Sequence, residues 1–92
     1  MIVSFANKET ELLANRTRLK KYKKVEKIAL RKLWQLDIAK SLSDLKTPPG
    51  NRLESLKGKR LGQHSIRINN QYRLCFIWTE KGPKQVEITD YH

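Results

Sequence analysis

The sequence predicts a small α+β domain in which N-terminal helices pack on one face of an antiparallel sheet of about four strands. Apolar residues recur every three or four positions in residues 25–42, which is typical of a helix with a buried face. In residues 64–69 and 85–90 they alternate with polar residues, which is typical of strands with one buried face. Helical segments followed by a run of strands indicate an α+β architecture.

In the first half, a short strand is expected at residues 2–5 and a short helix at residues 8–15. The main helix carries two apolar rows, which are Val25, Ala29, Leu33 and Leu36, and Leu30, Trp34, Ile38 and Leu42. Both rows, Trp34 included, are expected to lie in the core. Residues 47–51 (Thr-Pro-Pro-Gly-Asn) end the helical part, because proline removes a backbone donor and clashes with the preceding turn.

The second half has the period of strands. Leu53 and Leu56 flank a short segment that a turn at Lys57-Gly58 closes. Three strands follow, at residues 64–69, 72–78 and 85–90, joined by turns at Asn69-Asn70 and at residues 81–83. Trp78 and Cys75 lie within the middle strand and are interpreted as packed residues.

Size and charge limit the function classes. The 92 residues form one domain, 1–92, and the formal net charge of +11 favours a polyanionic partner such as RNA or the ribosome. The single cysteine, Cys75, excludes an intramolecular disulfide, and the sequence contains neither a signal h-region nor a spanning segment. A cytoplasmic protein without a membrane role is therefore expected.

Two groups of cations are candidate RNA contacts. Lys20, Lys21, Lys23 and Lys24 form a dense run that suits phosphate binding, although each alone is equally well a solvated charge. Arg67 and Arg73 alternate with apolar neighbours in adjacent strands, so the sheet can aim their guanidinium groups at a phosphate. The alternative for these arginines is a cross-strand salt bridge, for which Glu87 is one candidate partner.

Acid–base groups gather at the end of the sequence. Asp90, Tyr91 and His92 follow the last strand directly, and histidine suits proton transfer at neutral pH. Such groups can drive attack of an RNA 2′-hydroxyl on the adjacent phosphate without a metal or cofactor. We therefore expect neither a metal nor a cofactor. Glu54 is a candidate base, and His64 is a candidate RNA contact that is as well explained as a surface or stacking residue.

The second half resembles the HigB toxins of the RelE/ParE superfamily. The resemblance rests on residues 48–58 (PPGNRLESLKG), 62–69 (GQHSIRIN), 71–78 (QYRLCFIW) and 86–92 (VEITDYH), with a similar opening at residues 1–5. It implies a compact RelE-like domain and an mRNA interferase that cuts messenger RNA on the translating ribosome. It also implies inhibition by a HigA-type antitoxin with a helix-turn-helix DNA-binding domain.

The resemblance also implies roles for particular residues. It makes Arg73 and the terminal Asp90, Tyr91 and His92 catalytic, and it makes Lys57 and Arg67 contacts to RNA. The neighbouring Lys59 and Arg60 are further candidate RNA contacts. Some family members have a histidine before the Leu-Lys-Gly turn where this chain has Glu54. The alternatives are a ParE-like inhibitor of DNA gyrase and a non-catalytic RNA-binding module, since one fold hosts several activities.

Overall fold

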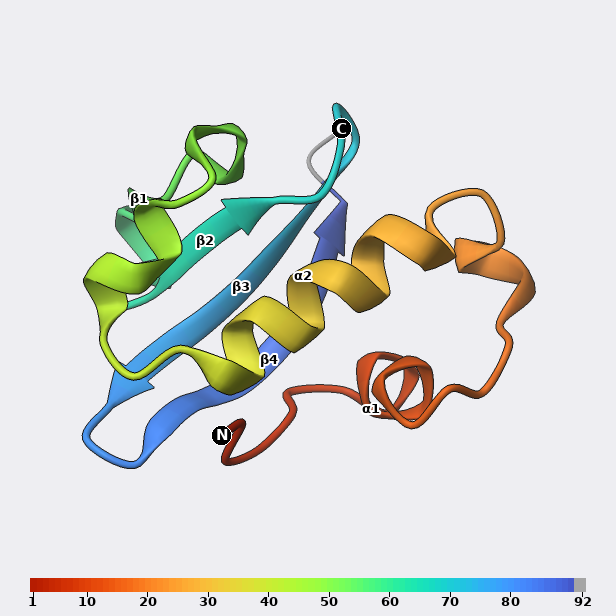
Figure 1. The fold of residues 1–92 in the computed structure, drawn as a ribbon, viewed down its shortest axis with the longest axis horizontal. Coiled ribbons are helices and arrows are strands. Elements are labelled where there is room, and N and C mark those ends of the chain that lie inside the picture. Colours follow the sequence, from red (N-terminus) through yellow and green to blue (C-terminus); the bar gives the residue numbers. More distant parts are fainter. Residues whose placement is uncertain (91–92) are drawn as a thin grey trace.

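A computed structural model describes residues 1–90 and confirms the predicted α+β class. Four antiparallel strands form one sheet in the order β1-β2-β3-β4, with the bounds Glu54–Ser55, His64–Arg67, Tyr72–Thr79 and Gly82–Asp90. Two α-helices precede the sheet, α1 (Lys8–Ala14) and α2 (Glu26–Ile38). Figure 1 shows α2 lying across one face of the sheet. No helix within residues 1–90 is both long and apolar enough to cross a membrane.

The core lies between the helices and this sheet face. From the helices it contains Leu13 of α1 and, from α2, Ala29, Leu33 and Leu36. The sheet contributes alternate residues of its strands, which are Ile66, Tyr72, Leu74, Phe76, Val86 and Ile88. These residues are all at most 9% exposed. The first apolar row of the main helix and the strand alternation are therefore confirmed.

The second apolar row of the main helix does not lie in the core as expected. Trp34 is 60% exposed and Ile38 is 52% exposed. The helix ends at Ile38 because Ala39 adopts an extended conformation, with φ −63° and ψ 132°. Leu42 instead begins a separate 3-10 turn, which a capping box between Ser41 and Asp44 stabilises.

Two boundaries of the sheet also differ from the prediction. The expected first strand makes a single bridge, from Phe5 to Val86, and this bridge is parallel. β4 begins at Gly82 and thus includes residues that we predicted to form a turn, because Gly82 and Pro83 pair with Thr79 and Trp78. The half-buried Trp78 packs at the margin of the core.

Contacts between residues far apart in the sequence fix the N-terminal segment against β4. The Oγ of Ser4 accepts a hydrogen bond from the N–H of Gln85 (3.0 Å), 81 residues away. The Oγ1 of Thr10 accepts one from the N–H of Ile88 (3.0 Å), 78 residues away. Thr10 is fully buried, so this bond anchors α1 to the last strand.

Candidate functional site

The two predicted arginines meet on the sheet face opposite the helices. Arg67 of β2 pairs in register with Arg73 of β3, and Ser65 pairs with Cys75. Side chains alternate across a strand, and Ile66 lies in the core, so these residues point away from the helices. We call this surface the arginine face and define it by the residues that share it, Glu54, Ser65, Arg67, Arg73, Cys75, Glu87 and Thr89.

Arg73 is fixed in position at the centre of this face. It is 8% exposed, and its Nε donates to the Oγ of the fully buried Ser65 at 2.8 Å. Its Nη2 donates to the carbonyl oxygen of Arg52 at 2.7 Å and lies 4.0 Å from Oε1 of Glu54. The strand pairing thus brings one predicted acid–base residue, Glu54, beside one predicted phosphate-binding arginine.

Arg67 is less constrained than Arg73. It is half-buried, and its guanidinium donates to the side chain of Asn70 in the β2–β3 turn. The predicted alternative, a cross-strand salt bridge, is confirmed for Arg73 with a different partner, since Arg73 pairs with Glu54 at 4.0 Å, whereas Glu87 pairs with Arg60 at 2.7 Å. Arg60 also donates to Gln63 at 2.9 Å, so it ties the β1–β2 loop to β4.

The lysine run lies at the same end of the sheet as the β2–β3 turn. The run surrounds the 3-10 turn Lys20–Tyr22, and the fully buried Tyr22 anchors it, with its ring edge-on to Tyr72 at 5.5 Å between centroids. Together with Asn69 and Gln71 the lysines line a hollow of about 330 Å³; they are Lys20, Lys21, Lys23 and Lys24. Lys21 also pairs with Glu9 at 3.4 Å.

The remaining predicted residues lie apart from the arginine face. Lys57 and Lys59 are exposed in the β1–β2 loop. His64 is on the helix side of the sheet, stacked on Phe76 at 6.2 Å, and its buried Nδ1 has no hydrogen-bond partner among residues 1–90. Asp90 pairs in register with Tyr72 and accepts a hydrogen bond from Nε2 of Gln71 at 3.0 Å. Two further predicted residues, Tyr91 and His92, lie outside the described residues.

A buried polar network that we did not predict adjoins Arg52, the residue whose carbonyl oxygen binds Arg73. Lys32 of α2 is 7% exposed, and its Nζ donates to Oδ1 of the fully buried Asn51 at 2.5 Å. Asn51 donates in turn to the carbonyl oxygen of Leu45 at 3.1 Å and directly precedes Arg52, whose carbonyl binds Arg73. Burial lowers the pKa of Lys32, and the nearby Arg31 and Arg67 charges lower it further.

The position of Lys32 in the helix was the signal for its burial. Lys32 follows Ala29 by three residues and precedes Leu36 by four, so it lies on the apolar side of α2. The long apolar stem of lysine can pack in the core while its ammonium group reaches a polar partner.

Cys75 behaves as the packed thiol that we predicted. It is fully buried in β3, and burial raises its pKa. Residues 1–90 contain no group of three histidine, cysteine or carboxylate side chains that could hold a metal ion.

Comparisons with known proteins agree with the fold and with the quoted motifs. The family model described as "RelE-like toxin of type II toxin-antitoxin system HigB" matches residues 4–92. Toxin HigB-1 of Vibrio cholerae is 52% identical over 56 residues, which are 61% of this chain and 59% of the relative. An uncharacterized protein of Haemophilus influenzae is 42% identical over 50 residues, 54% of this chain and 50% of that protein. These matches span between half and three fifths of each relative's length, whereas the family model covers nearly the whole chain. The chain therefore belongs to the HigB family of RelE-like toxins of type II toxin-antitoxin systems.

Proposed function

We propose that this toxin is a ribosome-dependent mRNA endoribonuclease that cuts translated messenger RNA without a metal or cofactor. The observation that carries the proposal is the position of the Glu54 carboxylate, 4.0 Å from the Arg73 guanidinium and on the same sheet face as Arg67. A proton acceptor beside two cations matches what RNA cleavage by its own 2′-hydroxyl requires.

Each group has a distinct role in this proposal. Arg67 and Arg73 bind the phosphate and stabilise the extra negative charge of its pentacovalent transition state. Glu54 accepts the proton of the 2′-hydroxyl, and its exposed side chain leaves it accessible to RNA. Glu54 takes up the proton of the 2′-hydroxyl, and a second group must give a proton to the leaving 5′-oxygen. In this proposal that acid is His92. Tyr91 and Asp90 assist it by stacking and by orienting the imidazole.

The other cations bind RNA or the ribosome in the same proposal. The lysine run lines a hollow near the end of β4, where phosphates that flank the cleaved bond would be neutralised. Further contacts come from the β1–β2 loop and the start of β2, namely Lys57, Lys59, Arg60 and His64. The toxin acts in the cytoplasm, and a HigA-type helix-turn-helix antitoxin inhibits it.

The proposal is tested by inducing the toxin in growing cells and mapping RNA 5′ ends by primer extension. Cuts should fall within translated codons and should disappear when translation of the reporter is blocked. Replacing Glu54 by glutamine should slow cleavage about 100-fold, the loss expected when a general base is removed. The matched control is Glu80→Gln, in the exposed β3–β4 turn, which should cut at the normal rate.

Two outcomes would refute the nuclease. Growth arrest with unchanged transcripts would contradict it, and so would full cleavage by both Glu54→Gln and His92→Ala. A supercoiling assay with purified gyrase identifies the ParE-like alternative, in which the toxin inhibits supercoiling directly. A non-catalytic RNA-binding module would bind RNA, leave it uncut and tolerate loss of His92.

A further inference from the structure

The outer side of α2 carries an exposed apolar stripe that the arginine face does not explain. Trp34 is 60% exposed, and with Leu30 and Ile38 it forms a row at four-residue spacing along the helix. Single exposed apolar residues are ordinary, whereas a row rimmed by charge is typical of a binding surface. This row lies on the helix side of the sheet, away from Arg67 and Arg73.

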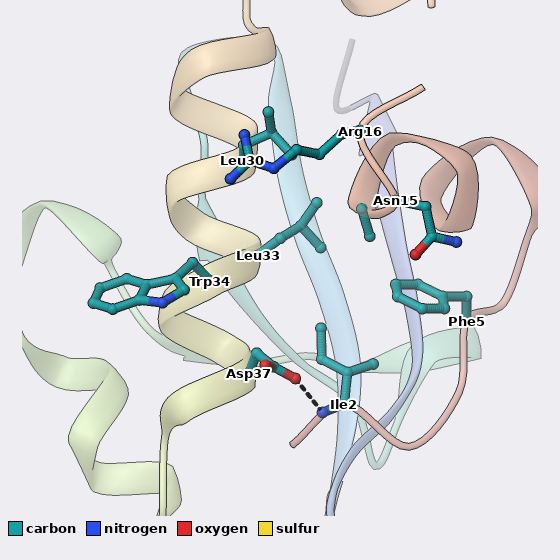
Figure 2. A pocket seen from close by; sticks show the side chains of 9 residues that line it. Ile2, Phe5, Asn15, Arg16, Leu30, Leu33, Trp34 and Asp37 are labelled. Carbon is teal, nitrogen blue, oxygen red and sulfur yellow. Dashed lines mark hydrogen bonds between the residues drawn. The ribbon is translucent and has the colours of Figure 1, made fainter. Parts of the chain in front are cut away.

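A hollow of about 340 Å³ adjoins the stripe, between α2 and the N-terminal segment. Figure 2 shows Phe5, Leu30 and Leu33 projecting into this space, with Arg16 reaching across it towards α2. A second hollow of about 300 Å³ lies beside Lys27 and Arg31 and shares Arg16, Leu30 and Trp34 with the first. The two hollows together form one groove, which we call the α2 groove.

The rim of the α2 groove carries unbalanced positive charge. Arg16, Lys27 and Arg31 are exposed, and no carboxylate within residues 1–90 pairs with any of them. The one acid among the described residues that line the groove, Asp37, accepts a hydrogen bond from the N–H of Ile2 at 2.8 Å. Lys27 and Arg31 are four residues apart on one helix, where like charges repel. An acidic partner would relieve this repulsion.

We propose that the antitoxin docks in the α2 groove through an acidic segment that carries one large apolar side chain. The apolar side chain enters the hollow beside Phe5 and Leu30, and the carboxylates of the segment pair with Arg16, Lys27 and Arg31. RNA fits this site less well, because six of the nine residues that line the first hollow are apolar and only one of them, Arg16, carries a positive charge. The proposal needs only the antitoxin that a type II toxin implies, and it stands whether or not the chain cuts RNA.

The test measures binding of the purified toxin to its cognate antitoxin by biolayer interferometry at two salt concentrations. Trp34→Ala should weaken binding at least about tenfold, as expected for a buried aromatic anchor. The double variant Lys27→Glu/Arg31→Glu should weaken binding by a similar factor and reduce its salt dependence. The matched controls are Leu61→Ala, which removes an 80% exposed apolar side chain elsewhere, and Lys46→Glu/Lys81→Glu, which reverses two exposed charges outside the groove.

Thermal unfolding of each variant shows whether it folds, and binding of a single-stranded oligoribonucleotide separates the two kinds of partner. The controls should bind the antitoxin within about twofold of the wild type, the scatter expected for surface positions. The proposal is wrong if folded Trp34 and Lys27/Arg31 variants bind the antitoxin normally. It is also wrong if these variants lose RNA binding alone, since the groove would then be an RNA surface.

Discussion

Replacing Arg73 by alanine should remove a large share of the stability of the fold, in addition to any effect on activity. The guanidinium donates to the Oγ and carbonyl oxygen of Ser65 and to the carbonyl oxygen of Arg52. Ser65 is fully buried, so alanine would leave its hydroxyl without this partner. Hydrogen bonds from a charged group contribute about 1.5–3 kcal/mol each, and the bond to the Ser65 carbonyl, at 3.4 Å, contributes little.

The two shorter bonds together should lower the free energy of unfolding by about 2–4 kcal/mol when they are lost. This is less than the sum of their separate contributions, because removing the arginine also removes the cost of burying its charge. A chain of this length has a free energy of unfolding of roughly 5–14 kcal/mol, so the loss is a substantial fraction of the total. Urea titration followed by circular dichroism measures it directly, provided that the slope with denaturant stays constant.

Arg67→Ala is the matched control, since Arg67 lies on the same face but is half-buried and donates to Asn70 in a turn. The free energy of unfolding of Arg67→Ala should fall by less than about 1 kcal/mol. The reasoning fails if Arg73→Ala also loses less than about 1 kcal/mol, or if the two variants are equally stable. If it holds, Arg67→Ala reports on phosphate binding more directly, because Arg73→Ala changes the fold and the chemistry together.

Three further predictions concern other parts of the molecule. Because the pKa of Lys32 is lowered in the folded state, stability should rise as the pH approaches 10.5 from below, and Lys32→Met should lose this rise in urea titrations between pH 7 and 10. The buried thiol of Cys75, whose pKa is raised, should react with iodoacetamide at pH 8 only after urea unfolds the chain, and rapid labelling of the native protein would contradict its burial. Gly82→Ala places a Cβ 2.1 Å from the carbonyl oxygen of Met1 at φ +124°, and should cost at least about 2 kcal/mol. Thermal unfolding measures this loss, and the control Gly50→Ala, whose Cβ meets nothing within 4 Å, should keep most of the stability in the same measurement.

The strands could be predicted because their period is local. Ile66 and Leu74 alternate with polar residues, and the Asn69-Asn70 turn sets Arg67 opposite Arg73. The exposure of Trp34 could not be predicted in this way, since two adjacent apolar rows run along α2. Which row is buried depends on how the helix lies on the sheet, and here the sheet covers the row of Leu33 and Leu36.

The candidate site was predictable in part for the same reason. The two arginines follow from one hairpin, whereas the approach of Glu54 to Arg73 depends on the pairing of β1 with β2 across the loop of residues 56–63. The supporting pair of Lys32 and Asn51 joins α2 to a 3-10 turn, 19 residues away in the sequence, and no periodic pattern relates these two positions.

The anchoring of α1 to β4 has a consequence for how the toxin folds as it is made. Thr10 leaves the ribosome 78 residues before its partner Ile88, which at roughly 5–20 residues per second is a delay of about 4–16 s. Throughout this delay Leu13 lacks the last strand of the sheet, and the nascent chain exposes this apolar side chain to chaperones and proteases. β4 also completes the sheet that carries Arg73, so a chain still in synthesis has neither its core nor its arginine face.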